Sequence, residues 1–284
     1  MIATEQITET IAHHGEGPVW NHDEKTLYWV DMLAGDVLEL GRDGSISRHH
    51  VGTVAAALRP RRDGGMVIAT ERGFALVEPG WSGLRSLPDV FGDPAVRMND
   101  GGCDLQGRFY CGTMAYEGTD GAGTLFRLDP DGSTHTVLTD LTVSNGLAWS
   151  SDGLLAYYVD SATQRIDVFD FDPVTAAFSD RRPVVTIDPE LGSPDGLTLD
   201  VDGGIWVALW DGSAVHRYSP AGALDEVIEL PTSRVTACTF GGPQLDELYI
   251  TTSALGLAGR EAVAGALFRA VPGVRGTAPA CFAG

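Results

Sequence analysis

The sequence contains no long apolar run. No stretch approaches the ~20 consecutive apolar residues that a membrane-spanning helix needs. The segment from Met1 to Trp20 carries Glu5 and Glu9 and has no apolar stretch as long as that of a signal peptide. We therefore expect a cytoplasmic protein with no membrane segment.

Positive charge is also scarce. The chain has 19 Lys and Arg residues against 39 Asp and Glu residues, which gives a formal net charge of −20. A surface of this sign repels the phosphate backbone of nucleic acids and anionic lipid, so neither is expected as a partner. Most of these carboxylates are expected to be solvated, which leaves only a few for a functional site.

Several catalytic and metal-binding motifs are missing. The four cysteines have no CxxC spacing, which argues against a zinc or redox motif, and we expect free thiols with Cys103 and Cys111 inside a sheet. There is no G-x-S-x-G nucleophile elbow, no P-loop and no H-E-x-x-H zinc motif. No amphipathic helical pattern of ~10–15 residues occurs, which argues against an α/β fold.

What the sequence does contain is many short β-rich segments separated by turns. Its 36 glycines and 15 prolines interrupt the chain frequently, and hydrophobic residues make up 43% of it. Turns such as Asp152-Gly153 precede alternating apolar runs, and a further strand follows each run. Six such runs align with one another: Thr26–Asp31, Gly65–Thr70, Arg108–Thr113, Leu155–Asp160, Gly204–Leu209 and Glu247–Thr252.

The spacing of these units predicts an all-β fold, namely a six-bladed β-propeller. Units about 40 to 50 residues apart match the length of a propeller blade, and radial repetition leaves no long exposed sheet edge. We expect one domain over residues 1–284. The alternating Ile2, Ile7 and Ile11 predict that the N-terminal segment adds the outer strand to the last blade and closes the ring.

Oxygen-bearing side chains recur at the start of the inner strand in four units. Carboxylate and amide oxygens without histidine or thiolate favour Ca²⁺, Mg²⁺ or Mn²⁺, with Zn²⁺ as a further candidate. Each residue pair alone is compatible with an ordinary turn, but the shared position predicts one metal site in the central channel. The four pairs are Glu16-Gly17, Asp100-Gly101, Asn145-Gly146 and Asp195-Gly196.

Six motifs occur in order along nearly the whole chain. They are Gly15–Trp20 (GEGPVW), Arg97–Gly101 (RMNDG), Gly112–Met114 (GTM) with Glu117 close behind, Ser144–Trp149 (SNGLAW), Pro194–Leu197 (PDGL) and Phe240–Pro243 (FGGP). Together they resemble the senescence marker protein/gluconolactonase/luciferin-regenerating enzyme family. The resemblance implies a six-bladed propeller with one divalent metal ion (Ca, Zn, Mn or Mg) in its channel. It also implies a sugar lactonase, which hydrolyses aldono-lactones to aldonic acids.

The resemblance assigns the metal ligands residue by residue. It implies that Glu16, Asn145 and Asp195 bind the ion. Asp100 instead matches the position next to Asn99, which stands where relatives have an asparagine near the metal. Asp195 is also implied as the catalytic base that activates water. The proton acceptor stays open, because a carboxylate bound to a cation has a lowered pKa and is a weaker base.

The substrate contacts follow from the same comparison. Arg97 and Glu117 match positions that bind sugar hydroxyls, and Asn99 stands near the metal, in contact with it directly or through water. Between Met114 and Glu117 the chain has Ala115-Tyr116 followed by a glycine-rich loop. The expected partner is therefore a small-molecule sugar lactone, and the expected assembly is a monomer or a weak homo-oligomer.

Alternatives from other classes remain at this point. One is a calcium-binding regulatory protein without turnover, and others are a propeller scaffold for protein partners or a related propeller hydrolase that acts on other esters. A pure metal binder does not need Arg97 and Glu117. The particular sugar lactone is not specified by the sequence.

Overall fold

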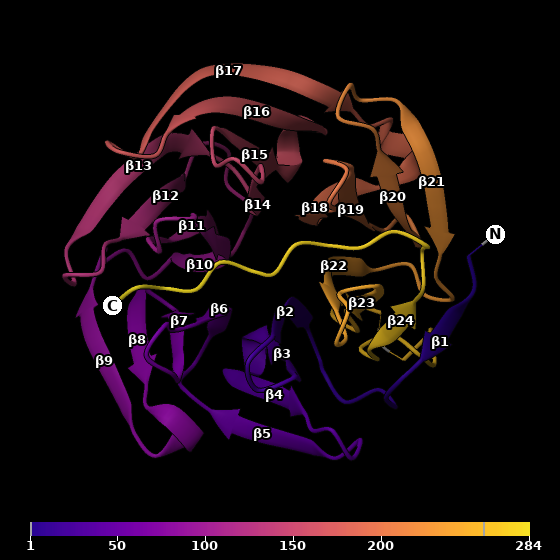
Figure 1. The fold of residues 1–284 in the computed structure, drawn as a ribbon, viewed down its shortest axis with the longest axis horizontal. Helices are drawn as coiled ribbons and strands as arrows, with labels where there is room; N and C mark the ends of the chain where they lie inside the picture. The colour runs from indigo at the N-terminus through magenta and orange to yellow at the C-terminus, as the bar shows by residue number, and fades with distance from the viewer. Residues whose placement is uncertain (1, 258) are drawn as a thin grey trace.

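Six four-stranded antiparallel sheets surround a central channel in this computed structural model, which describes residues 2–257 and 259–284 (Figure 1). The first sheet contains β2 (Gly15–Asn21), β3 (Thr26–Asp31), β4 (Asp36–Leu40) and β5 (Ile46–His50). The second contains β6 (Ala55–Pro60), β7 (Met66–Thr70), β8 (Gly73–Val77) and β9 (Leu84–Asp89). The third contains β10 (Val96–Cys103), β11 (Phe109–Ala115), β12 (Gly123–Leu128) and β13 (Thr134–Leu141).

The remaining three sheets repeat the same order from the channel outward. The fourth contains β14 (Ser144–Trp149), β15 (Leu155–Asp160), β16 (Arg165–Asp172) and β17 (Ala177–Thr186). The fifth contains β18 (Ser193–Leu199), β19 (Ile205–Trp210), β20 (Ala214–Tyr218) and β21 (Leu224–Glu229). The sixth contains β22 (Val235–Gly241), β23 (Glu247–Thr252), β24 (Phe268–Ala270) and, as its outer strand, β1 (Thr4–Gln6). The predicted six-bladed propeller is confirmed.

The two ends of the chain meet in the sixth sheet. β1 pairs antiparallel with β24, and Ile7 N–H donates a hydrogen bond of 2.8 Å to the carbonyl oxygen of Leu267. An isolated bridge between His14 and Ser253 joins the first and last sheets next to the channel. The sheet that completes the ring is therefore built from both ends of the sequence.

The core lies between neighbouring sheets. Strands β2 and β3 are buried along their whole length, whereas the outer strand β5 is mostly exposed. Large aromatic side chains such as Trp29, Tyr110 and Trp206 are fully buried, and burying a large apolar side chain stabilises the fold by roughly 1.5–3 kcal/mol. Cys103 and Cys111 are buried free thiols, as expected.

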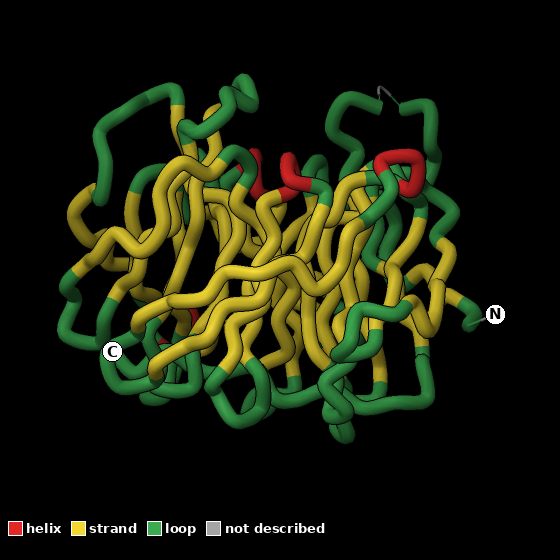
Figure 2. The backbone as a smooth tube through the Cα atoms, turned by 90° about the horizontal axis from the view of Figure 1, so that it is seen from above, coloured by secondary structure: helices red, strands yellow, loops and turns green. Residues whose placement is uncertain are grey.

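Helical structure in the described residues is limited to single turns. These are η1 (Met32–Ala34), η2 (Pro79–Trp81), η3 (Ser161–Thr163) and η4 (Pro189–Leu191), and Figure 2 shows most of them at one face of the disc. Among the residues described, no helix is long and apolar enough to cross a membrane.

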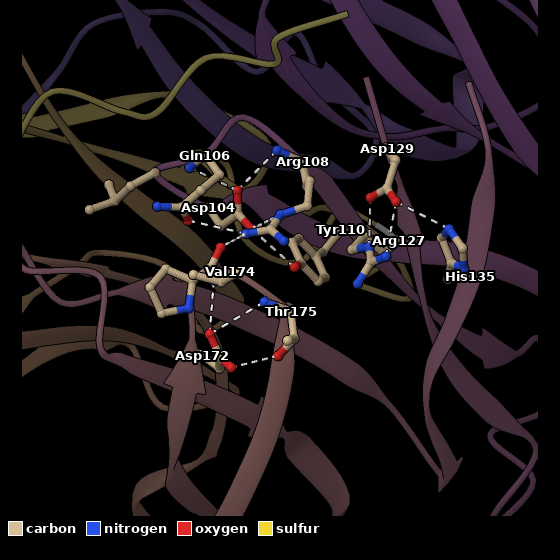
Figure 3. Close-up of polar contacts among 12 residues, drawn as sticks. Asp104, Gln106, Arg108, Tyr110, Arg127, Asp129, His135, Asp172, Val174 and Thr175 are labelled. Carbon is tan, nitrogen blue, oxygen red and sulfur yellow. Dashed lines mark hydrogen bonds and ion pairs between the residues drawn. The ribbon is translucent and has the colours of Figure 1, made fainter. Parts of the chain in front are cut away.

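Buried carboxylates also stabilise the hairpins at the opposite face. Asp104 accepts hydrogen bonds from Arg108 Nε (2.6 Å) and the Tyr110 hydroxyl (3.0 Å), and Arg108 donates onward to the carbonyl oxygen of Pro173 in the next sheet (Figure 3). Asp200 has the equivalent role in the fifth sheet, where it accepts from Trp206 Nε1 at 2.9 Å. These acids are fully partnered, which identifies them as structural groups.

The C-terminal segment crosses the channel opening at this hairpin face, from β24 toward the second sheet (Figure 1). Gly276 N–H donates to the carbonyl oxygen of Leu245 at 2.8 Å, and Phe282 N–H donates to that of Pro60 at 2.8 Å. Phe282 itself is buried in the hydrophobic core. The segment therefore closes one end of the channel, and the other end remains for a site.

Candidate functional site

A β-bulge interrupts each of the six inner strands beside the channel. In β14 the residues without a partner in β15 are Asn145 and Gly146, and in β18 they are Asp195 and Gly196. Glu16 lies at the edge of the corresponding bulge in β2. A bulge reorients a side chain away from the regular alternation of a strand, so these three polar side chains are aimed into the channel.

The third sheet corrects the alignment that placed Asp100 beside these residues. The bulge in β10 leaves both Asn99 and Asp100 unpaired, and Asn99 has the same position relative to the pairing as Asn145 in β14. Asp100 is turned toward a separate cavity of about 100 Å³ at the closed end of the channel, which Arg59 also lines. The sequence alignment compared the residue before the first glycine of each inner strand and therefore chose Asp100. The pairing register decides which side chain faces the site, and the residue before glycine does not.

At the open end of the channel lies a cavity of about 360 Å³. Five of the residues predicted from the sequence line it together, namely Glu16, Arg97, Asn99, Asn145 and Asp195. The cavity is also lined by residues that were not predicted: His14, Met114, Val143, Ser161, Ala162, Gln164, Ser193, Trp210 and Leu255.

Glu117 is the predicted site residue that the structure does not bring into this group. It is exposed in the turn that follows β11, next to the exposed Tyr116. Its role as a substrate contact stays a prediction.

A chain of hydrogen bonds connects the predicted residues across three sheets. Arg97 Nη1 donates to Asn99 Oδ1 at 2.6 Å, and Asn99 Nδ2 donates to Asn145 Oδ1 at 2.7 Å. Asn145 Nδ2 then donates to Ser161 Oγ at 2.7 Å, whose hydroxyl donates to the carbonyl oxygen of Pro194 at 2.6 Å. Because Pro194 directly precedes Asp195, the chain fixes the relative positions of the polar groups around the cavity.

The two carboxylates of the cavity are buried and poorly compensated. Asp195 Oδ1 is a buried oxygen without a hydrogen-bond partner. Burial, and then the charges of Glu16 and Asp100, raise the pKa of Asp195 well above its ordinary value. Burial and the charge of Asp100 likewise raise the pKa of Glu16 to about 8. Buried acids in this state are stabilised by a cation placed between them.

The oxygen donors fit a divalent metal ion. Among residues 2–257 and 259–284 no group of three or more His, Cys, Asp or Glu side chains is arranged to hold a metal. The candidate set is different in kind, because it combines the carboxylates of Glu16 and Asp195 with the amide of Asn145. Such a set of hard oxygen donors suits Ca²⁺, Mg²⁺ or Mn²⁺, and the unpartnered Asp195 Oδ1 supplies a free ligand atom.

Arg97 brings a buried positive charge to the same cavity. Its guanidinium contacts the sulfur atoms of Met32 (3.0 Å) and Met114 (3.2 Å) and lies 5.8 Å from the centre of the Tyr116 ring. Burial lowers its pKa from the ordinary value. Sulfur is a weak hydrogen-bond acceptor, so the guanidinium retains capacity to bind oxygen atoms of a ligand.

His14 and Trp210 form an aromatic part of the wall that sequence reasoning missed. Their rings meet edge to face with centroids 5.8 Å apart, and His14 Nδ1 lies 2.8 Å from Ser253 Oγ. Burial lowers the pKa of His14 to about 3, so the imidazole is neutral at neutral pH. No motif spacing marks His14, which lies two residues before Glu16, and its contacts with Trp210 and Ser253 come from segments far away in the chain.

Two of the residues that were not predicted, Ser161 and Gln164, lie at positions that the repeat pattern of the sequence could have indicated. They follow Asp160 at the end of β15, where a strand of each repeated unit reaches the open end of the channel. Loops at such an end are where a propeller places its variable side chains.

Comparison with known proteins identifies the family. Residues 14–254 match the family described as SMP-30/Gluconolactonase/LRE-like region. The chain belongs to this family. Its relatives include the putative sugar lactone lactonase YvrE of Bacillus subtilis, 34% identical over 97% of both chains, and the pentonolactonase XacC of Haloferax volcanii, 36% identical over 87% of this chain and 84% of the relative.

A solved structure agrees with the fold over nearly the whole chain. It is that of a calcium-binding protein, regucalcin, from Agrobacterium tumefaciens, which superposes with a TM-score of 0.93 at 26% identity and covers 99% of this chain and 97% of that one. The family resemblance inferred from the six motifs is thus confirmed.

Proposed function

We propose that this protein is a sugar lactonase that hydrolyses the ester bond of aldono-lactones to give aldonic acids. The observation that carries the proposal is that Asp195, whose Oδ1 is buried and unpartnered, and the buried Arg97 guanidinium line the same cavity at the open end of the channel. The names of the lactonase relatives support the same reaction class. A cavity of about 360 Å³ is large enough for a sugar lactone.

The proposed cofactor is one divalent metal ion, held by Glu16, Asn145 and Asp195. When bound, the ion supplies Lewis-acid polarisation of the lactone carbonyl. The calcium-binding relative supports a divalent cation in this family. Asn99 donates through Nδ2 to Asn145 Oδ1 and thereby holds this ligand in place.

The side chains of the cavity bind the substrate and transfer the proton. Arg97 binds oxygen atoms of the lactone through its Nη groups and orients the ring. Asp195 accepts a proton from the attacking water, whose oxygen bonds to the carbonyl carbon. The bond between that carbon and the ring oxygen then breaks, and the ring oxygen takes up the proton as the hydroxyl of the open acid. We retain Glu117 as a proposed substrate contact, which a substrate-bound structure tests directly.

The second candidate is a calcium-binding protein without turnover, which the description of the regucalcin relative favours. The buried Arg97 argues for catalysis, because a cation binder gains nothing from a second positive charge beside its site.

A panel of aldono-lactones assayed by pH-stat, with and without EDTA, tests the proposal. We expect hydrolysis that EDTA abolishes and that Ca²⁺, Mn²⁺, Mg²⁺ or Zn²⁺ restores to different degrees, because an all-oxygen site selects weakly among these ions. If the metal-loaded protein hydrolyses none of the lactones, the lactonase proposal is refuted and the calcium-binding function without turnover replaces it. Full activity of demonstrably metal-free protein would refute the metal requirement.

A further inference from the structure

Gln164 lines the cavity from a different sheet than Arg97 and has an unsatisfied amide. Its Nε2 donates to Ser193 Oγ at 2.9 Å, but its Oε1 is a buried oxygen without a hydrogen-bond partner. Leaving a buried acceptor unpaired is unfavourable, and such groups in native proteins call for a partner. Gln164 lines the cavity, so a ligand bound there lies beside this amide.

The backbone at Gln164 is also strained. The residue ends the turn η3 with φ 56° and ψ 34°, in the left-handed region that glycine adopts more readily than other residues. The first sheet has the same turn after its second strand, η1, and there the corresponding residue is Gly35 with φ 69°. The fold thus accommodates glycine at this position, and glutamine is present at a cost in conformational energy.

Two contacts hold the strained residue in place. Gln164 N–H donates to the carbonyl oxygen of Ser161 at 3.1 Å, and Ile187 N–H donates to the carbonyl oxygen of Gln164 at 2.9 Å. Ser161, in the same turn, accepts a hydrogen bond from the proposed metal ligand Asn145. The amide of Gln164 is therefore fixed relative to the reaction centre.

We propose that Gln164 is a specificity-determining residue whose side-chain amide hydrogen-bonds one hydroxyl group of the lactone substrate. The inference rests on the proposed lactonase function and adds to it a further recognition point, separate from Arg97 and Glu117. A hydroxyl group both donates and accepts, so it pairs with the free amide atom in either orientation of the amide. The predicted substrate class is a polyhydroxylated lactone that carries a hydroxyl at this position.

The test compares kcat/KM for a good sugar lactone and its monodeoxy analogues in wild type and in Gln164→Leu. In wild type, kcat/KM for one analogue should be about 10-fold lower than for the parent lactone, because removal of the hydroxyl group that contacts Gln164 leaves the amide unpaired. In Gln164→Leu the parent should fall by about 10-fold and that analogue should show no further loss.

Gln164→Gly provides a second variant whose folding is safeguarded, since Gly35 adopts the same backbone conformation in the first sheet. It should lose the same discrimination. Gln244→Leu is the matched control, because Gln244 is exposed and lies outside the cavity, and it should behave as wild type.

The outcomes separate the two proposals. Parent-to-analogue ratios that are unchanged in both variants at every position would overturn the role of Gln164 while leaving the lactonase function intact. Absence of hydrolysis in wild type would overturn the lactonase function itself.

Discussion

Replacing Asp195 by asparagine should lower activity and raise the stability of the metal-free protein. Asparagine keeps the shape and one oxygen but removes the charge and the basicity. If Asp195 accepts the proton of water, kcat falls by about 10³-fold, or about 4 kcal/mol of barrier. The same change removes a buried charge with an unpartnered oxygen and with Glu16 and Asp100 nearby. The midpoint of thermal unfolding in EDTA should therefore rise.

A matched control makes the same chemical change at a partnered acid. Asp200 accepts hydrogen bonds from Trp206 Nε1 (2.9 Å) and Arg217 Nε (2.7 Å), so Asp200→Asn should lose roughly 1.5–3 kcal/mol of stability. It should leave kcat nearly unchanged.

The assays are initial rates on the best lactone, thermal unfolding with and without EDTA, and metal content by elemental analysis. Each Asp195→Asn sample must first be shown to contain metal, because a missing ion mimics a catalytic defect. Wild-type kcat in metal-loaded Asp195→Asn would refute the assignment of Asp195 as the base. A lowered unfolding midpoint in EDTA would refute the electrostatic reasoning.

Two further predictions follow from the charges of the cavity. Arg97→Ala removes no proposed ligand and takes away a positive charge beside them, so calorimetry should give a metal affinity no lower than that of wild type, while kcat/KM falls by about 10- to 100-fold; unchanged kcat/KM would contradict substrate binding by Arg97. The pKa of Glu16, raised to about 8 by burial, means that the metal-free protein has its full stability below about pH 4.5 and loses stability as the pH rises through 8. Unfolding midpoints in EDTA should thus decline between pH 5 and 9, more steeply than in Glu16→Gln, and an equal slope in both proteins would contradict the shift.

The hydrogen bonds that a buried carboxylate accepts distinguish structural acids from functional ones in this fold. Asp104, Asp200 and Asp195 are all buried, and all three stand in hairpin or bulge positions that sequence patterns describe alike. Asp104 and Asp200 receive hydrogen bonds from arginine and aromatic side chains, whereas Asp195 Oδ1 has none. Only the folded structure reveals this difference.

The sequence by itself determined the all-β class, the number of blades and five of the polar residues that line the cavity. Alternating strands and Asp-Gly turns are local signals, because a hairpin depends on residues adjacent in the chain. The repetition of one unit then implies the ring. Glu16, Asn145 and Asp195 were found in this way because they occupy the same place in the first, fourth and fifth repeats.

The tertiary structure alone decided whatever depends on distant segments. The register of the bulge in β10 selected Asn99 over Asp100. The contact of His14 with Trp210 of the fifth sheet formed the aromatic part of the wall, and the C-terminal segment closed the opposite end of the channel. The unpaired amide of Gln164 is visible only once Ser193 and the cavity surround it. These features arise from pairing and packing between residues far apart in the chain, and no local pattern encodes which partner each side chain meets.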